Sequence, residues 1–400
     1  MARAALNESS FDIAVVGAGI VGAACAREFA DAGLRTALIE PGVVGGGATA
    51  AGMGHIAVMD DSEAQFALTR YSQILWKQLA ERLPADGEYV RCGALWVAAD
   101  EAEMAEVHRK QRYYSERGVP VEILDSHSLA QAESNLRPGM AGALLLPDDA
   151  VAYPPCVAKF LVNEALELGA KLIQGRRVAA IGGGTATLDD GTKISSLNFV
   201  LANGIAAPVL MEGLPIQPRK GHLVITDRYP GFVQHQMIEL GYLRSAHASD
   251  IDSVAFNVQP RPSGQLLIGS SRQYGSNDSG VDAQIIGAML KRAFEYMPGL
   301  RALSAIRSWT GFRAATPDKL PLIGPCPGRE DVYLATGHEG LGITTSLGTA
   351  RVLADLVLKR ECAIETTPYA PERTSHPLAD ARGSVQIGGA RGSVQTMRSI

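Results

Sequence analysis

Three glycines near the start of the chain have the spacing and context to bind a dinucleotide. Gly17, Gly19 and Gly22 follow the apolar, β-rich run 11–16 and open a helical pattern over about 20–32. In that spacing the first glycine permits a tight turn, the second lets the backbone approach a pyrophosphate, and the third lets the helix pack on the strand. The helix N-terminus adds free N–H groups and a partial positive charge.

Glu40 supports the same interpretation from the end of the next strand. The apolar segment 37–39 ends at this acid, about 20 residues after the glycines, where a carboxylate accepts hydrogen bonds from ribose hydroxyls. Its negative charge would repel a 2′-phosphate, so NADP is disfavoured. The stretch therefore predicts an ADP-containing dinucleotide, NAD or FAD, and does not choose between them.

A second strand, glycine loop and helix lies far along the chain. Segment 331–336 has the apolar character of a buried strand, the loop 337–344 is GHEGLGIT, and we expect an apolar-striped helix over 341–358. Its N-terminus is a second place that stabilises negative charge. A flavin gains from one such unit at its pyrophosphate and another at the ring carbonyl where charge builds on reduction. A nicotinamide cofactor has little use for two, so FAD is favoured.

The loop 41–54, PGVVGGGATAAGMG, is rich in glycine and is expected to contain no helix. It suits a close backbone approach to a flat group, with the Thr49 hydroxyl available. A plain surface linker is the alternative, but it would expose Met53. His55 follows at once and is a catalytic candidate, although a lone histidine is more often structural.

The composition describes an ordinary globular protein. The chain has 400 residues, 46% hydrophobic and 20% charged, which favours two domains. A net charge of −5 gives no reason to expect a nucleic-acid partner. No run approaches the roughly 20 apolar residues of a membrane span, and no signal peptide is expected before residue 11. Five scattered cysteines without a C-x-x-C pair argue against disulfides and zinc and suit the cytoplasm.

The residue pattern and composition of the chain change at two places. From 218 to 268 strand patterns alternate with turns, which predicts a second, antiparallel domain. From about 361 there are few large apolar residues and the sextet ARGSVQ occurs twice, which predicts a disordered tail without a catalytic role. Elsewhere we expect helices over 62–83, 101–117, 154–168 and 281–297, and strands over 88–98, 141–146, 197–201 and 307–315.

Four segments, in order, resemble the D-amino acid oxidase family of FAD enzymes. They are VVGAGIVGAACAREFADAG…LIE (15–40), GATAAGMG (47–54), WTGFRAATPDKLPLIG (309–324) and GHEGLGITTSLGTA (337–350). Within the family the chain looks similar to bacterial glycine oxidase and to the flavin subunit of hydrogen cyanide synthase. It looks most similar to the flavin subunit of D-hydroxyproline or D-proline dehydrogenase, through the runs 218–232 and 254–275.

The resemblance, which covers about residues 11–360, implies an α/β fold. A glutathione-reductase-like Rossmann domain would bind FAD, and a second domain with an antiparallel sheet would bind substrate. The implied boundaries are 11–85, 150–218 and 316–360 for the first domain, 86–149 and 219–315 for the second, and 361–400 for the disordered tail. The residues expected at the cofactor are Gly17, Gly19, Ile20, Val21, Gly22, Glu40, Thr49, Gly52, Met53, Val178, Ala202, Gly204, His338, Gly340, Leu341, Gly342, Ile343 and Thr344.

The same likeness assigns substrate residues. Arg313 sits where the family's arginine grips the substrate carboxylate. Asn257 and Arg272 fall on positions that line the pocket over the flavin in glycine oxidase, where the side chains are aromatic and thioether. Polar side chains here disfavour glycine and suit a substrate with an additional hydroxyl. Gly340 stands where glycine oxidase has an arginine, and Val178 matches the residue whose backbone meets the adenine.

The reaction implied is transfer of the Cα hydrogen as hydride to flavin N5, which leaves an imine. Arg313 is the expected clamp, and its alternative role is a structural ion pair with Asp318. Tyr242 and His222 are further pocket candidates, each more often a satisfied sheet residue. His338 is expected to shape the flavin loop and not to act as a base.

Three further functions stay open on the sequence alone. A glycine oxidase-like enzyme that produces H2O2 is the runner-up, followed by an electron-relay flavin subunit and a nicotinamide-dependent dehydrogenase. The expected partners are an amino or imino acid, and either acceptor subunits or a quinone, in a homo- or hetero-oligomer. No metal and no transmembrane segment are expected. The expected location is the cytoplasm, with peripheral attachment to the inner face of the membrane left open.

Overall fold

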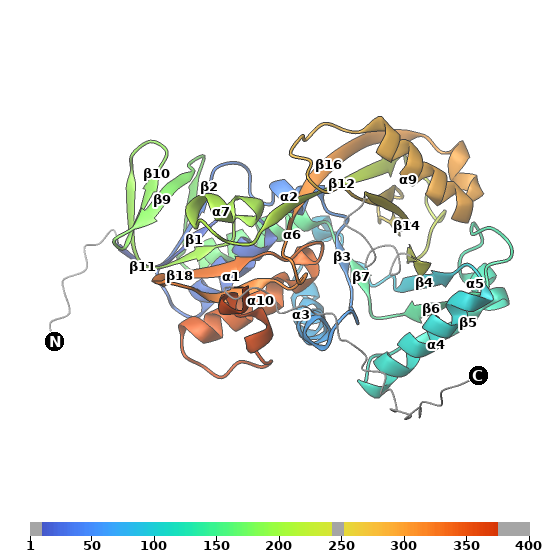
Figure 1. Cartoon of the computed structure of the whole chain (residues 1–400), viewed down its shortest axis with the longest axis horizontal. Coiled ribbons are helices and arrows are strands. Elements are labelled where there is room, and N and C mark those ends of the chain that lie inside the picture. Colours follow the sequence, from blue (N-terminus) through green and yellow to red (C-terminus); the bar gives the residue numbers. More distant parts are fainter. Residues whose placement is uncertain (1–9, 242–251, 375–400) are drawn as a thin grey trace, which may run out of the picture.

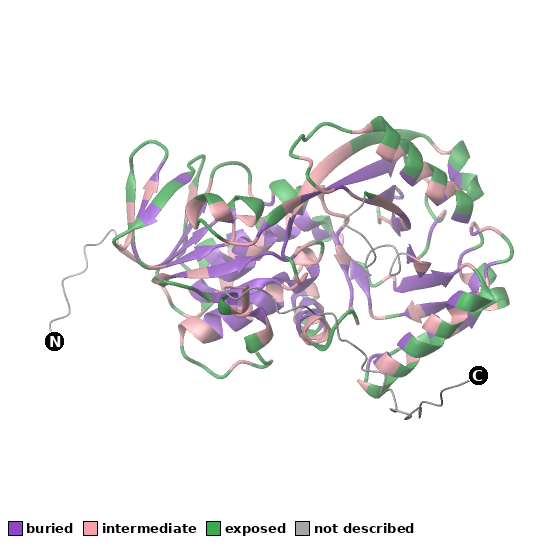
Figure 2. Ribbon diagram, in the orientation of Figure 1, coloured by how far each residue is buried: buried purple, intermediate pink, exposed green. Residues whose placement is uncertain are grey.

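The computed structural model describes residues 10–241 and 252–374, in which two large sheets lie side by side (Figure 1). Helices cover both sheets, and the strands at their centres are buried (Figure 2). Within the described ranges, no helix is both long enough and apolar enough to cross a membrane.

The first sheet joins segments that are far apart in sequence. Its strands in spatial order are β17 (Leu322–Cys326), β18 (Arg329–Thr336), β11 (Lys193–Leu201), β1 (Ser10–Val16), β2 (Thr36–Glu40) and β8 (Lys171–Gln174), with β10 (Thr185–Leu188) and β9 (Val178–Gly182) attached to β11. Strands β18, β11, β1, β2 and β8 are parallel. The carboxyl ends of β1, β2, β11 and β18 therefore meet at one edge of the sheet.

The second half of strand β1, residues 13–16, is entirely apolar because both of its faces are buried there. Ile13 and Val15 pack in a core with four helices, which are α1 (Ile20–Asp31), α3 (Glu63–Ala80), α6 (Pro154–Glu167) and α10 (Gly342–Val357). Ala14 and Val16 point to the other face, into a core shared with β9, β10 and the short helix α7 (Ala207–Leu210).

The second sheet is built mainly from the segments predicted to form the substrate domain. Its order is β16 (Ala305–Ala315), β12 (Gln217–Thr226), β15 (Leu266–Arg272), β14 (Ser253–Pro260), β13 (Gln236–Glu239), β4 (Ala94–Ala98), β6 (Gly142–Leu146) and β5 (Glu122–Asp125). All pairs are antiparallel except β13 with β4. Helix α9 (Ala283–Tyr296) packs on the sheet through Met289 and Ala293. Helices α4 (Glu101–Glu116) and α5 (Ser126–Ala132) pack on the other end of the sheet, formed by β4, β6 and β5 (Figure 1). Strands β3 (His55–Ile56) and β7 (Ala150–Val151) pair with each other in a separate two-stranded antiparallel sheet.

The expected α/β class, with a mainly parallel sheet and a second, mainly antiparallel one, is confirmed. Two local expectations are wrong. The loop 41–54 contains a short helix, α2 (Gly47–Ala51), because Ala-Thr-Ala-Ala is a run without a helix breaker. The strand expected over 88–98 begins only at Ala94, after Gly93 has turned the chain with φ +74.

The expectation of disorder from residue 361 is wrong for 361–374. Tyr369 is 1% exposed, and its hydroxyl donates to the Ala64 carbonyl at 2.5 Å. Arg373 donates to both carboxylate oxygens of Asp318, at 2.7 and 3.2 Å. This segment therefore packs on the first domain, and the rest of the expected tail lies outside the described residues. The domain boundaries stay a prediction.

Candidate active site

The first glycine turn is closed tightly against its neighbours. Gly17 has φ +99, and its amide donates to the Ile39 carbonyl at 2.8 Å. A Cβ atom at Gly17 would stand 2.8 Å from the Ala202 carbonyl oxygen, and one at Gly22 would stand 1.9 Å from the Gly17 carbonyl oxygen. Neither position accepts a side chain, so the start of α1 stays at the carboxyl edge of the sheet, where open α/β sheets bind ligands.

Glu40 and Thr49 frame this helix N-terminus. Oε2 of Glu40 accepts from the Ala18 amide and Oε1 from the Gly42 amide, both at 2.8 Å. Because a carboxylate offers about four lone-pair sites, each oxygen retains capacity for a ribose hydroxyl. Thr49 Oγ1 accepts from the Ile20 amide at 3.0 Å, so this hydroxyl also ties α2 to α1. These groups fit the ADP half of a dinucleotide.

The two glycine loops converge on each other. A Cβ atom at Gly52 would stand 2.7 Å from Cδ1 of Ile343. One at Gly342 would stand 3.4 Å from Cβ of His338 and 3.9 Å from Cγ2 of Val21. The loop after α2 and the first turn of α10 are therefore in contact, as expected of two loops that hold one cofactor.

His338 is a buried part of the second loop. It is 7% exposed, its Nε2 lies 3.0 Å from Oγ1 of Thr349, and its carbonyl accepts from the Leu341 amide at 2.9 Å. Burial lowers the pKa of His338 to about 3, so the ring is neutral at pH 7. These contacts hold the loop in shape.

His55 and Thr344 fasten the first loop to α10. The Thr344 hydroxyl donates to the His55 carbonyl at 2.9 Å, and the Thr344 carbonyl accepts from Trp76 Nε1 at 2.9 Å. Burial lowers the pKa of His55 to about 4, and its Nε2 lies 4.0 Å from Oδ2 of Asp149. Burial also raises the pKa of the Asp149 carboxyl well above its usual value. His55 is thus placed as a neutral ring beside a buried acid.

Three further residues expected at the cofactor occupy the first domain. The Ala202 amide donates to the Val16 carbonyl at 2.9 Å, directly after β11. Gly204 has φ +57, and its carbonyl accepts from the Thr336 hydroxyl at 3.1 Å. Val178 is the buried first residue of β9. Ala202 and Gly204 lie at the same sheet edge as Gly17.

Arg313 extends from β16 across the neighbouring strand. Its Nη1 donates to the Ser271 carbonyl at 3.0 Å, and a Cβ atom at Gly221 would stand 2.6 Å from the same nitrogen. The guanidinium therefore lies over Gly221 on β12. On its other side, a Cβ atom at Gly340 would stand 3.6 Å from Nε of Arg313. Arg313 therefore lies beside the second glycine loop. Asp318, the alternative partner expected for Arg313, forms an ion pair with Arg373.

The carboxylate of Glu339 lies close to several arginine side chains, among them Arg313. Its carboxylate forms an ion pair with Arg219, and its amide donates to the Ala314 carbonyl at 2.9 Å. Burial alone would raise the pKa of Glu339, but the charges of Arg272, Arg313 and Arg219 hold it below its usual value. Glu339 was missed from the sequence, where the only signal was its place between two predicted cofactor residues.

Two other residues predicted to contact the substrate, Asn257 and His222, lie on strands of the second sheet. Asn257 faces Gly269 across β14 and β15, and its Oδ1 accepts from Nε2 of Gln236. His222 is fully buried, with Nδ1 3.0 Å from the Ser271 hydroxyl and Nε2 accepting from the Asp282 amide at 3.1 Å, so it joins the sheet to α9. Tyr242 lies outside the described residues.

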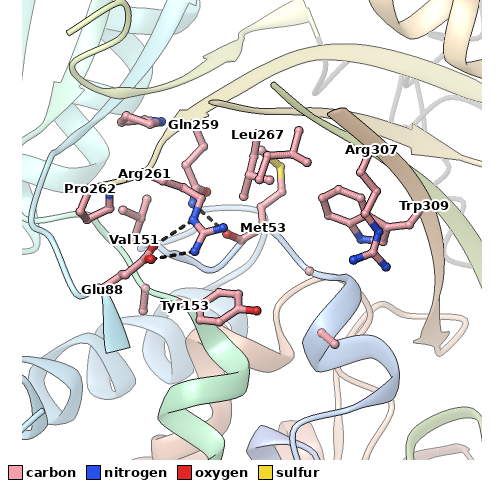
Figure 3. A pocket seen from close by; sticks show the side chains of 15 residues that line it. Met53, Glu88, Val151, Tyr153, Gln259, Arg261, Pro262, Leu267, Arg307 and Trp309 are labelled. Atoms are coloured by element: carbon pink, nitrogen blue, oxygen red, sulfur yellow. Dashed lines mark hydrogen bonds and ion pairs between the residues drawn. The ribbon is translucent and has the colours of Figure 1, made fainter. Parts of the chain in front are cut away.

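A pocket of about 190 Å³ lies between the first loop and the second sheet (Figure 3). Met53 stands at its centre in the view, and its carbonyl accepts from Nε2 of Gln259 at 2.8 Å. Arg261 and Glu88 form a two-pronged ion pair at one side, with distances of 2.8 and 2.9 Å. Gln259, buried and polar on a strand, was another residue that the sequence did not single out.

Comparisons with known proteins agree with this geometry. Residues 12–356 match the family model described as DAO: FAD dependent oxidoreductase. The glycine oxidase of Geobacillus kaustophilus is 28% identical over 91% of this chain and 97% of its own length. Hydrogen cyanide synthase subunit HcnC of Pseudomonas aeruginosa is 25% identical over 91% of this chain and 96% of its own length.

Solved structures show the same fold. The crystal structure of glycine oxidase from Geobacillus kaustophilus superposes with a TM-score of 0.82, covers 90% of this chain and 98% of its own, and is 28% identical. The structure of L-proline dehydrogenase from P. horikoshii has a TM-score of 0.82, covers 92% of this chain and 99% of its own, and is 24% identical. The predicted similarity to the glycine oxidase group is confirmed, and the predicted cofactor is confirmed as FAD. The chain belongs to the DAO family of FAD-dependent oxidoreductases, and it is an FAD-dependent amino-acid oxidoreductase.

Proposed function

We propose that this enzyme oxidises a D-amino or cyclic imino acid of the D-proline or D-hydroxyproline type at Cα. The observation that carries the proposal is the position of Arg313, with its guanidinium over Gly221 and its stem beside Gly340 in the second glycine loop. A planar guanidinium binds a carboxylate in two parallel hydrogen bonds, which fixes the direction of the neighbouring Cα–H bond.

The protein's part in the reaction is to bind and orient. FAD, which residues such as Gly17, Glu40 and Gly342 of the two glycine units would hold, would supply a two-electron acceptor for the hydride from Cα. The substrate amine must arrive neutral, so that its lone pair can form the imine as the hydride leaves. His338 is a neutral, buried ring held by Thr349, which suits a loop-shaping role. Orientation over the acceptor is therefore the main catalytic contribution of the chain.

Asn257 and Arg272 favour a substrate that is larger and more polar than glycine. Asn257 is already hydrogen-bonded by Gln236, and Arg272 belongs to the charged surroundings of Glu339. Glycine has no side chain for such groups to contact. Glycine oxidase activity stays the second candidate, because the glycine oxidase of Geobacillus kaustophilus is similar over 91% of this chain.

Anaerobic flavin reduction tests the proposal directly. The holoenzyme is mixed without oxygen with D- and L-proline, D- and L-hydroxyproline, glycine and other amino acids, and bleaching of the flavin absorbance is followed. We expect the D-imino acids to bleach the flavin fastest. Fastest bleaching by glycine would favour the second candidate, and no bleaching by any amino acid would favour an electron-relay subunit. Admission of air then separates an oxidase from a dehydrogenase that passes electrons to a quinone or partner subunit.

A further inference from the structure

The pocket of Figure 3 is separate from the place where Arg313 is expected to hold substrate. On β16 the alternate residues Trp309, Gly311 and Arg313 share one face of the sheet. Trp309 lines the pocket, and a Cβ atom at Gly311 would stand only 2.3 Å from Cβ of Ala51. The end of α2 therefore covers this face between the pocket and Arg313.

Met53 divides the same two regions on strand β15. A Cβ atom at Gly269 would stand 3.1 Å from Sδ of Met53. Leu267 precedes Gly269 by two residues and lines the pocket. Ser271 follows Gly269 by two residues, and its carbonyl accepts from Arg313 at 3.0 Å. The end of the loop 41–54 thus forms a wall, with the pocket on one side and Arg313 on the other.

This wall is also part of the expected cofactor site. Gly52 lines the pocket, and a Cβ atom on Gly52 would stand 2.7 Å from Cδ1 of Ile343 at the start of α10. Because the two glycine units are expected to hold FAD between them, one layer of residues would separate a ligand in the pocket from the cofactor. Each turnover leaves FAD reduced, and an acceptor must then take two electrons. The pocket has a suitable position for that acceptor.

Two buried polar atoms of the pocket have no hydrogen-bond partner within residues 10–241 and 252–374. They are Oε1 of Gln259, which is an acceptor, and Nε1 of Trp309, which is a donor. Gln259 is only 1% exposed, and its Nε2 already donates to the Met53 carbonyl at 2.8 Å. Because buried polar groups are costly without partners, the two atoms point to a ligand that supplies the complementary groups.

The two atoms lie far enough apart to contact opposite ends of one ligand. Leu267 stands between Gln259 and Trp309 in the view (Figure 3). The strand register places Gln259 beside Leu267, Leu267 beside Ile225, and Ile225 beside Arg307. Three strand spacings of about 4.8 Å each therefore separate the Cα atoms of Gln259 and Arg307, and Trp309 follows Arg307 on the same face. A ligand that reaches both atoms needs a polar group at each end.

The middle of the pocket suits a small, flat and uncharged ligand. Apolar surface comes from Leu267 and Met53, and an aromatic ring comes from Tyr153. The charge of Arg261 is compensated by its ion pair with Glu88 at 2.8 Å. The volume of about 190 Å³ is below the roughly 300–1,000 Å³ of pockets for drug-sized ligands, so it admits a ligand of one or two rings.

We propose that this pocket binds the ring of a para-quinone, which accepts the electrons of the reduced flavin. Such a ring is flat and apolar and carries an oxygen at each end. Trp309 Nε1 donates to one oxygen, and Gln259 Oε1 accepts from the hydroxyl that the other oxygen becomes on reduction. The site therefore favours the hydroquinone, because only the reduced ligand satisfies both protein atoms.

The quinone takes up two electrons and two protons in this step. The anionic reduced flavin supplies both electrons and one proton, and solvent supplies the second proton. The flavin returns to its oxidised state, and the hydroquinone leaves the pocket. The inference goes beyond the proposed function, since it concerns the reoxidation of FAD and holds whichever amino acid reduces it.

Binding to the oxidised holoenzyme tests the site without turnover. Calorimetric titration under nitrogen compares three ligands with the same tetramethylated ring. Durohydroquinone has a hydroxyl at both ends, duroquinone has two carbonyls, and durenol has a single hydroxyl. We expect durohydroquinone to bind about fivefold or more tightly than either of the others. Equal binding of durohydroquinone and durenol, or binding of neither, would overturn the inference.

Trp309→Phe keeps an aromatic ring and removes the N–H group. We expect this variant to bind durohydroquinone about fivefold more weakly and to lose most of the preference over durenol. The matched control is Ser308→Ala, which changes the neighbouring exposed residue on the opposite face of β16 and should bind all three ligands as the wild type does. An unchanged preference in Trp309→Phe would contradict the contact assigned to the indole.

Reoxidation of the flavin tests the acceptor role. The holoenzyme is reduced with a stoichiometric amount of dithionite, so that no amino acid is needed, and duroquinone is added without oxygen. We expect the flavin absorbance to return in the wild type and in Ser308→Ala, and severalfold more slowly in Trp309→Phe. Binding of durohydroquinone without any return of absorbance would overturn the acceptor role, as would equal rates in all three proteins. Reoxidation by duroquinone in an enzyme whose flavin no amino acid bleaches would overturn the proposed function alone.

Discussion

Arg313 lies across Gly221, so closely that a Cβ atom on the glycine would stand 2.6 Å from Nη1 of the arginine. Two neighbouring strands thus position Arg313, the proposed substrate clamp. One strand supplies the guanidinium, and the other leaves space for it by lacking a side chain. The carbonyl of Ser271 on the third strand fixes the direction of the guanidinium.

Gly221→Ala is expected to displace the clamp without removing it. The added methyl group must push the guanidinium away, and misplacement of a binding group by about 1 Å costs up to about 100-fold in rate. We expect kcat/KM to fall by about 10- to 100-fold while the flavin stays bound. Gly287→Ala, on α9 where nothing lies within 4 Å of the new Cβ, is the control and should leave kcat/KM unchanged. Equal kinetics for both variants would show that Arg313 tolerates the methyl group.

Arg313→Ala removes the clamp itself. We expect a fall of about two orders of magnitude or more in kcat/KM, because one bidentate carboxylate contact is lost. FAD absorbance should be retained, since Gly17 and Glu40, which are expected at the dinucleotide, keep their hydrogen bonds to Ile39 and Ala18. The control is Arg228→Ala, which removes an exposed arginine of the same domain. Unchanged steady-state kinetics in Arg313→Ala would refute the clamp.

Gly22→Ala tests the dinucleotide end of the site. Its Cβ atom would stand 1.9 Å from the Gly17 carbonyl oxygen, so α1 must move away from the first glycine turn. We expect FAD affinity to weaken by at least about tenfold, measured by flavin release during dialysis. Gly182→Ala, at a position with nothing within 4 Å, is the matched control. Retention of a full complement of FAD by Gly22→Ala would contradict this reading of the turn.

The parts of the fold predicted best were those with local patterns. The turn at Gly17 and the helices α1 and α10 follow from glycine spacing and apolar periodicity within short segments. Arg313 was located through its motif, whereas Gly221, Glu339 and Gln259 were missed. Their roles depend on the strand register across β12, β15 and β16 and on contacts between loops that are far apart in sequence. The residues adjacent to them in sequence form no motif that would identify these roles. The helix α2 was missed because three preceding glycines obscured a short helix-forming run.

The buried ring of His338 predicts a loss of stability in acid. Burial lowers the pKa of His338 from 6.5 to about 3. Between these values the unfolded chain binds a proton that the folded chain does not, so the free energy of unfolding falls as pH decreases from about 6.5 towards 3. His338→Gln, which can still bond to Thr349, should make this decline shallower by up to about 1.4 kcal/mol per pH unit.

Denaturant unfolding of the holoenzyme at several pH values measures this slope. His127→Gln, which replaces an exposed histidine of α5, is the control. The same slope for His338→Gln and wild type would mean that His338 is protonated in the folded protein at mild acidity.

Tyr369 and Arg373 predict a sharp boundary for C-terminal truncation. A chain that ends at residue 360 loses the buried ring of Tyr369, its hydrogen bond to Ala64 and the ion pair of Arg373 with Asp318. Removal of a buried aromatic side chain costs about 3–5 kcal/mol, so the melting temperature should fall by roughly 6–20 °C.

The matched control ends at residue 374 and keeps all of these contacts. It should melt with the full-length holoenzyme and reduce its flavin with the same substrates at the same rates, because the ARGSVQ repeats lie beyond every residue that we place at the site. Equal melting of the two truncated chains would show that Tyr369 contributes little. Slower flavin reduction in the chain that ends at 374 would instead give the repeats a role in the reaction.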